Sequence, residues 1–195
     1  VLTMELQRGV MGDLASFPAL RDAAIEVGLV EHATAICELA RAIDLPVVHL
    51  TAEFRADRAG TAVNTPLHSA VLRRDGHLLE GTEAVELIPE LGPETSDLVI
   101  PRRHGVSPFS GTSLDTTLRN LGVETVIVTG VSVNLGVLGL AIEAANLGYQ
   151  VVIATDAVCG TPRDYADRVL AETFALIASL VTTEELLAAM TTAST

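Results

Sequence analysis

The sequence predicts an α/β domain in which a parallel sheet lies between two layers of helices. Two observations lead to this fold class. Short runs of β-branched and aliphatic residues alternate along the chain with longer segments of helical periodicity. The runs are also nearly continuous in apolar residues, which is typical of strands that are buried on both faces. Strands that alternate with helices favour right-handed crossovers, and hence a parallel sheet covered on both sides.

The predicted sheet has six strands within one domain that spans residues 1–195. A chain of 195 residues with 49% hydrophobic content can bury a sizeable core. No linker, repeat or low-complexity tract indicates a second domain. The strand candidates are residues 1–6, 46–52, 97–101, 124–131, 149–157 and 176–182.

Helical patterns lie between these strands. Thr112 or Ser113 can cap a helix that Gly122 ends. Thr161 and Pro162 are expected as the cap and the first residue of a later helix. The predicted helices cover residues 23–43, 82–91, 112–121, 134–147, 163–177 and 183–190.

Residues 53–81 are the exception, because this polar, Gly- and Arg-containing stretch has no sustained period. A long segment without regular structure inside a compact domain is usually a functional loop or a lid. A contact with another subunit is the alternative for this segment.

Composition narrows the class of partner. A formal net charge of −13 disfavours binding to nucleic acid or to anionic membranes. All 12 basic residues are arginines, and arginine binds carboxylate and phosphate groups through two parallel hydrogen bonds. We therefore expect a small, anionic molecule as ligand, with solvated loops as the alternative role for these arginines. Several fall in two segments: Arg55, Arg58, Arg73, Arg74, Arg102 and Arg103.

No apolar stretch approaches the roughly 18 residues of a membrane span, and no secretory signal is recognisable. We therefore expect a cytoplasmic protein, whose natural N-terminus lies upstream because the chain does not begin with Met. Cys37 and Cys159 have no metal-site or redox spacing and are expected as free thiols. His49 is expected as a core histidine, and no metal or cofactor is expected.

Polar side chains follow several of the predicted strands. In open parallel sheets, ligands bind beyond the carboxyl ends of the strands. This rule selects Glu5 and Gln7 after the first strand, Arg55 after the second, and the segment from Arg102 to Phe109 after the third. Glu5 ends an apolar strand, so its carboxylate requires a cation nearby, from Arg103 or Arg102. The pair is either a catalytic acid or base with its partner, or a structural ion pair.

The fourth strand enters a helix through the corner "GVSVNLG". Free N–H groups and the positive end of the helix dipole make such a corner suitable for an anion. Ser132, Val133 and Asn134 are candidate ligand contacts, although Asn134 also suits a helix cap. Gly136 and Gly139 each cost about 1 kcal/mol in a helix relative to Ala, so close packing or close ligand approach is expected there.

The stretches "VIPRRHGVSPFSGTSLDTTLRNLG" and "VTGVSVNLGVLGLAIEAANLGY" resemble the isochorismatase-like cysteine hydrolases, and the resemblance extends over nearly the whole chain. It implies a Rossmann-like, three-layer fold with a six-stranded parallel sheet, and assembly into a homodimer or homotetramer. Family sites typically contain an Asp in a D-x-Q motif, a Lys, and a Cys at the helix corner. On this chain these positions fall on Glu5, Arg103 (or Arg102) and Gly136, with Gln7 retained. The family's cis peptide is expected between Ser132 and Val133.

Each substitution has a chemical consequence. Glu5 keeps a carboxylate but moves it by about one methylene, and Arg103 keeps a charge but cannot act as a neutral base. Gly136 removes the thiol, which excludes a thioester mechanism at that position. Isochorismatases also carry Gly there, and the resemblance implies acid-catalysed hydrolysis of a vinyl ether by such members.

Two hypotheses follow. The first is a hydrolase without a thiol nucleophile that acts on a small anionic metabolite, with Glu5 as acid or base. The second is a catalytically inactive relative that binds a small ligand. A hydrolase that uses Cys159 or Ser132 as a relocated nucleophile is a third, weaker alternative.

Overall fold

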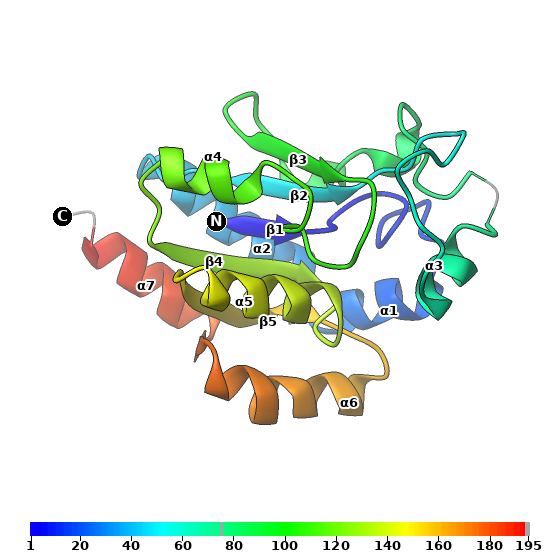
Figure 1. Ribbon diagram of the computed structural model, residues 1–195. Helices are drawn as coiled ribbons and strands as arrows, with labels where there is room; N and C mark the ends of the chain where they lie inside the picture. Colours follow the sequence, from blue (N-terminus) through cyan, green and yellow to red (C-terminus); the bar gives the residue numbers. More distant parts are fainter. Residues whose placement is uncertain (75, 194–195) are drawn as a thin grey trace.

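A computed structural model describes residues 1–74 and 76–193. Its centre is a sheet of six strands in the order β3-β2-β1-β4-β5-β6, and every neighbouring pair is parallel. The predicted fold class is therefore confirmed (Figure 1). The strands are β1 (Leu2–Met4), β2 (Val48–Ala52), β3 (Leu98–Arg102), β4 (Thr125–Val131), β5 (Gln150–Cys159) and β6 (Ser179–Val181).

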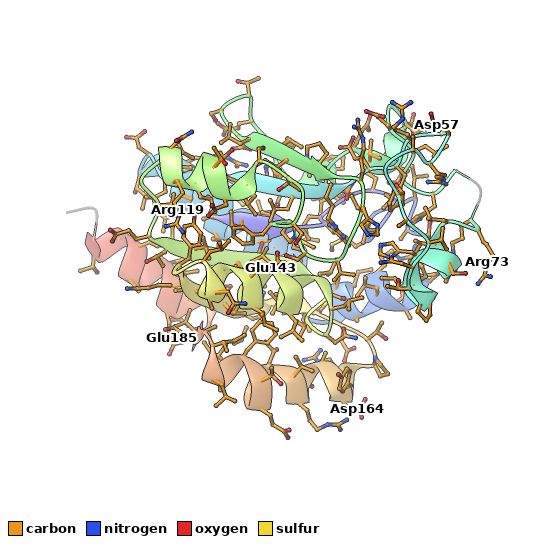
Figure 2. The ribbon with its side chains drawn as sticks, viewed as in Figure 1. Asp57, Arg73, Arg119, Glu143, Asp164 and Glu185 are labelled. Atoms are coloured by element: carbon orange, nitrogen blue, oxygen red, sulfur yellow. The ribbon has the colours of Figure 1, made fainter. Side chains whose placement is uncertain are left out.

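One face of the sheet is covered by α4 (Leu114–Asn120), α5 (Gly136–Asn146) and the segment that begins with α6 (Arg163–Arg168) (Figure 1). The loop after β3 is fastened to this layer by Glu143 of α5, labelled in Figure 2. The Glu143 carboxylate accepts hydrogen bonds from the hydroxyls of Ser107 and, at 2.8 Å, Ser110. This loop therefore has a defined path from β3 to α4.

The other face is covered by α1 (Pro18–Glu26), α2 (Leu29–Ala42) and α7 (Thr183–Ala193). The sequence predicts one helix over 23–43, and the structure has two. Gly28 separates them with a φ of 64°, a left-handed conformation that glycine adopts without a steric penalty. Pro18 at the first position of α1 moves the start of the helical region upstream of the prediction.

Several predicted helices differ in extent. Residues 82–91 form two 3₁₀ turns, η1 (Glu83–Val85) and η2 (Pro89–Leu91), because Pro89 lacks the N–H that a continuous helix needs. After α6 the chain continues as a π turn, η3 (Val169–Thr173), and a 3₁₀ turn, η4 (Phe174–Leu176). Pro162 is the N-cap residue of α6 and not its first residue, so Thr161, the expected cap, lies one position before the cap.

Within the segment 53–81, the structure has a short helix, α3 (Pro66–Val71), that the sequence pattern did not reveal. Thr65 caps α3, because its hydroxyl accepts a hydrogen bond from the N–H of His68 at 3.1 Å. None of the helices within residues 1–74 and 76–193 has the length and apolar character needed to cross a membrane.

A buried polar cluster links α2 with β1, β2 and the residue that precedes β3. The carboxylate of Asp97 accepts hydrogen bonds from Arg41 Nε at 3.0 Å, Arg41 Nη2 at 2.8 Å, His49 Nε2 at 3.1 Å and the Glu94 N–H at 2.8 Å. The hydroxyl of Thr3 then donates to His49 Nδ1 at 2.7 Å. His49 is 0% exposed, so it is a core histidine in a hydrogen-bonded network.

Candidate active site

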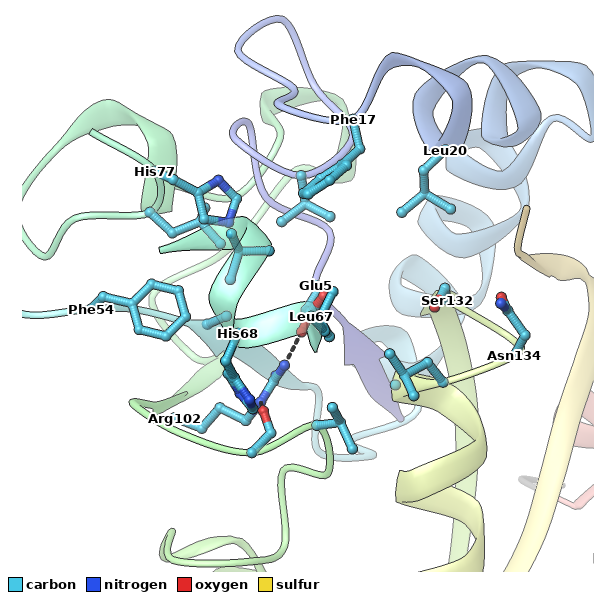
Figure 3. A pocket seen from close by; sticks show the side chains of 18 of the residues that line it. Glu5, Phe17, Leu20, Phe54, Leu67, His68, His77, Arg102, Ser132 and Asn134 are labelled. Carbon is cyan, nitrogen blue, oxygen red and sulfur yellow. Dashed lines mark hydrogen bonds and ion pairs between the residues drawn. The ribbon is translucent and has the colours of Figure 1, made fainter. Parts of the chain in front are cut away.

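A cavity of about 280 Å³ lies beyond the carboxyl ends of β1 and β4 (Figure 3). Its floor comes from Glu5 after β1, Arg102 at the end of β3, and Ser132, Asn134 and Gly136 at the β4–α5 corner. The parallel topology brings these segments together, since the carboxyl ends of all the strands meet at one edge of the sheet.

Glu5 and Arg102 form an ion pair within this cavity. Arg102 Nη2 donates to Glu5 Oε1, and Arg102 Nε donates to the carbonyl of Gly105 at 3.0 Å. The remaining nitrogen, Nη1, is buried and has no hydrogen-bond partner among the described residues. Burying a donor without a partner costs free energy, so this nitrogen is the unsatisfied group of the pair.

Glu5 also has an uncommon backbone conformation. Its φ is 53°, a left-handed value that residues with a side chain rarely adopt. Its N–H still donates to the Leu50 carbonyl at 2.9 Å, so β1 remains paired up to this point. Such conformations tend to occur at functional sites. This turn places the Glu5 side chain along the cavity (Figure 3).

The structure corrects the expectation for Arg103. Its guanidinium donates to Glu80 Oε1 at 2.7 Å, and both side chains are about half exposed. Successive residues at a strand end point to opposite sides, so only one of two adjacent arginines can face the cavity. That residue is Arg102, which the sequence analysis gave as the alternative.

The β4–α5 corner lies at the opposite side of the floor from Arg102. The cis peptide is Val131–Ser132, at the end of β4 and one residue earlier than expected. Leu135 is the N-cap residue of α5 and makes no side-chain cap. The helix-cap interpretation of Asn134 is therefore wrong; Asn134 Nδ2 instead donates to the Thr161 carbonyl at 3.4 Å.

Gly136 is the first residue of α5 and lines the cavity. A Cβ atom at this position would lie 2.9 Å from Met4 Cε and 3.2 Å from the Val131 carbonyl oxygen. Any side chain at position 136 would require Met4 to move. Close packing is thus the reason for Gly136, and the Met4 methyl group lies against the position that a nucleophile's Cβ would occupy.

Two expected contact residues, Gln7 and Arg55, do not line the cavity. Gln7 is fully buried; its amide donates to the carbonyls of Ala52 and Val85 at 3.1 and 3.0 Å and accepts from the Ala52 N–H at 2.8 Å. Arg55 pairs with Asp57, labelled in Figure 2, at 2.7 Å, and both side chains are exposed. Arg55 points to solvent because it extends from the outer turn of the 53–81 segment.

Phe109 and Val133 were expected in the pocket and lie in the hydrophobic core. The Phe109 ring stacks against Tyr149 with 5.9 Å between ring centroids. Val133 is 0% exposed, and its N–H donates to the Cys159 carbonyl at 2.8 Å. Both side chains are apolar, and they pack into the core although the two residues lie in loops beside the cavity.

The outer wall of the cavity contains residues that the sequence analysis did not identify. Phe17 and Leu20 come from the start of α1, and six further residues come from the segment 53–81, which therefore covers part of the cavity. The signal in the sequence that could have identified these wall residues is the presence of apolar residues in an otherwise polar segment. The residues from the 53–81 segment are Phe54, Leu67, His68, Val71, His77 and Leu78.

Neither cysteine lines the cavity. Burial raises the pKa of Cys159 to about 12, although Arg163 opposes this shift, and the pKa of Cys37 to about 11. Cys159 Sγ lies 3.9 Å from the Leu20 carbonyl oxygen. A thiol with such a pKa is a poor nucleophile near neutral pH, so the geometry does not favour Cys159 as a relocated nucleophile.

Within the described residues, no three His, Cys, Asp or Glu side chains cluster as a metal site would require. Ser132 lines the cavity, but no hydrogen bond within residues 1–74 and 76–193 joins its hydroxyl to a histidine or carboxylate. The charged groups of the cavity floor are thus Glu5 and Arg102.

Sequence comparison places these features in a family. The model of the isochorismatase domain matches residues 2–185. The uncharacterized isochorismatase family protein YwoC of Bacillus subtilis is 36% identical over 102 residues, which are 52% of this chain and 53% of YwoC. The ureidoacrylate amidohydrolase RutB of Variovorax paradoxus is 35% identical over 80 residues, 41% of this chain and 31% of RutB. The chain spans about half the length of the curated relatives that match it first.

Solved structures agree with this assignment. An isochorismatase family protein from Desulfovibrio vulgaris superposes with a TM-score of 0.83 at 26% identity, over 97% of each chain. A cysteine hydrolase from Pseudomonas syringae pv. phaseolicola superposes with a TM-score of 0.85 at 24% identity, over 98% of this chain and 92% of that chain. The second likeness concerns the fold alone. From the domain match over nearly its whole length and from this shared fold, the chain belongs to the isochorismatase family.

Proposed function

We propose that this protein is a hydrolase of a small anionic metabolite that works without a thiol nucleophile. The observation that supports this most directly is the Glu5–Arg102 pair, which lines a cavity beside the N-terminus of α5 where Gly136 is the first helical residue. The cavity thereby combines a group that can transfer a proton, a cation and a helix dipole.

Glu5 is the proton-transfer residue in this proposal. With a vinyl ether as substrate, Glu5 donates a proton to the vinylic carbon, and water adds to the resulting oxocarbenium ion. The hemiketal then breaks its C–O bond to release an alcohol and a carbonyl compound, and the proton lost by water returns to Glu5. With an amide, Glu5 accepts a proton from the attacking water. A positioned carboxyl group contributes about 10² to 10⁴ in rate in such steps.

Arg102 and the start of α5 position the substrate. Arg102 Nη1 offers an unused donor to a carboxylate or carbonyl oxygen. The N–H of Gly136 is at the positive end of α5, which stabilises negative charge. The name of one similar protein, an amidohydrolase, agrees with hydrolysis as the reaction type. The absence of a thiol at position 136 separates the proposed mechanism from a thioester route.

The test is turnover of a panel of carboxylated vinyl ethers and small amides by the wild type, Glu5→Gln and Glu80→Gln. We expect Glu5→Gln to lose at least about 100-fold in kcat/KM. Glu80→Gln is the matched control, because it removes a carboxylate that pairs with an arginine outside the cavity. Unchanged turnover by Glu5→Gln would contradict the mechanism.

A second candidate function is binding without turnover. The direct contact between Glu5 and Arg102, which neutralises both charges, favours it. If no member of the panel reacts but one of them raises the Tm of the wild type, and Arg102→Gln abolishes that rise, the protein is a ligand-binding relative.

A further inference from the structure

The outer wall of the cavity is mostly apolar. Phe17, Leu20, Phe54, Leu67 and Val71 all contribute to it. Ligand pockets of this kind bury an apolar body and fix its orientation through a small number of polar groups. A ligand whose carboxylate meets Arg102 would therefore place an apolar body against this wall.

Two histidines, His68 and His77, also line this wall. The ring of His68 makes several contacts with other residues of the protein. The hydroxyl of Thr65 bonds with His68 Nδ1 at 2.8 Å. The His68 ring stacks on His104 with 4.9 Å between ring centroids, and the Gly105 backbone also hydrogen-bonds with His68. These contacts give His68 a role in the fold of the wall.

His77 differs from His68 in the hydrogen bonds of its ring. His77 Nδ1 bonds with Ser16 Oγ at 3.0 Å, and Nε2 has no partner within residues 1–74 and 76–193. The ring lies edge-on to Phe17 at 6.0 Å and tilted against Phe54 at 6.2 Å. Figure 3 shows His77 near Phe17, whereas Arg102 lies beside His68 and Glu5.

The imidazole of His77 is also neutral over the ordinary pH range. His77 is 6% exposed, and burial lowers its pKa to about 4, although Glu5 partly opposes this shift. The neutral imidazole contacts Ser16, Phe17 and Phe54, and its Nε2 has no partner among the described residues. Such a ring can hydrogen-bond with a polar group of a ligand without attracting a second anion.

We propose that His77 is a specificity-determining residue, whose Nε2 hydrogen-bonds with a hydroxyl group on the apolar body of a small carboxylate held by Arg102. A hydroxyl fits both tautomers, because it donates to Nε2 when Nδ1 carries the proton and accepts from Nε2 when Nδ1 does not. The inference rests on the cavity of the proposed function being the ligand site, but it does not require turnover.

The test uses two probes that differ by one hydroxyl, phenylacetate and 4-hydroxyphenylacetate, and calorimetric titration of the full chain. We expect the wild type to bind the hydroxylated acid about 5- to 10-fold more tightly, as one neutral hydrogen bond provides. His77→Phe should bind both acids equally, because it keeps a ring and loses Nε2. His77→Gln, which places an amide near the position of Nε2, should recover part of the preference.

His32→Phe is the matched control, since His32 lies on α2 and does not line the cavity; its preference should equal that of the wild type. Chemical denaturation confirms that each variant folds. A preference that survives in His77→Phe, equal binding of both acids by the wild type, or binding of neither acid would overturn the proposal. If the wild type prefers the hydroxylated acid but hydrolyses no vinyl ether or amide of the substrate panel, the proposed hydrolase is refuted and the role of His77 stands.

Discussion

Two carboxylate–arginine pairs in this protein differ in how completely they are satisfied. Asp97 receives hydrogen bonds from Arg41, His49 and the Glu94 backbone, and its side chain is 3% exposed. Among the residues that the structure describes, Glu5 receives one such bond, from Arg102, and Arg102 Nη1 has no partner.

Their surroundings differ as well. The Asp97 cluster is sealed beside the sheet, and its polar groups satisfy one another. The Glu5–Arg102 pair lies along a cavity, with Glu5 in a left-handed conformation. A closed network stabilises a single packing, whereas an open pair with an unused donor is arranged for a molecule from outside. Thus residue type alone does not distinguish a structural pair from a site pair; the count of unmet hydrogen bonds does.

The sharpest test of this comparison is stability. Asp97→Asn should lower the free energy of unfolding by about 3 kcal/mol, because it leaves the Arg41 guanidinium, whose side chain is 11% exposed, without its counter-charge. Glu5→Gln should lower it by less, about 1 kcal/mol, because Glu5 accepts one hydrogen bond where Asp97 accepts four. Urea unfolding of both variants measures the difference. Equal losses would mean that Glu5 and Arg102 form a structural pair.

Acid should weaken both regions. Burial lowers the pKa of His49, although Asp97 opposes this, and lowers that of His77 to about 4. The unfolded chain protonates these histidines near pH 6.5 and the folded chain does so only at lower pH, so stability falls as pH decreases from about 6.5 toward 4. Burial would raise the pKa of Asp97, but hydrogen bonds from Arg41, Glu94 and His49 outweigh it and lower the pKa. A further loss therefore follows below about pH 4.

Urea unfolding at a series of pH values checks this dependence. His77→Phe should show a shallower loss between pH 6.5 and 4 than the wild type, while the His49 share remains. A profile identical to that of the wild type would show that His77 does not titrate differently in the folded and unfolded states.

The smallest expected effect concerns the corner where a nucleophile is missing. Gly136→Ala should cost about 1 kcal/mol, since its Cβ requires the Met4 methyl group to move. Met4→Val should make room, so the loss in the double variant should be smaller than the sum of the two single losses. Additive losses in urea unfolding would show that Met4 does not restrict position 136.

Some of the site was predictable from residue identity alone. The six strands follow from runs of apolar residues, and the place of Glu5 and Gly136 at strand ends follows from the parallel topology. The lack of a thiol at position 136 is also a property of the sequence. These features depend on local composition and on the order of the elements along the chain.

The choice between Arg102 and Arg103 could not be read from the sequence. Adjacent residues at a strand end point to opposite sides, so an error of one residue in the strand boundary exchanges them. Phe109 and Val133 likewise lie in loops near the cavity, yet their side chains pack into the core. The direction in which a single side chain points is set by contacts with segments that are distant in the sequence.

What the sequence by itself determined is the order of the six strands along the chain, the position of the carboxylate after the first strand, and the glycine at the helix corner. Only the tertiary structure decided which arginine pairs with Glu5, how Met4 packs against Gly136, and how the segment 53–81 brings His77 to the cavity wall. The physical reason is that periodicity and composition act over neighbouring residues, whereas a cavity wall depends on packing between segments that are far apart in the chain.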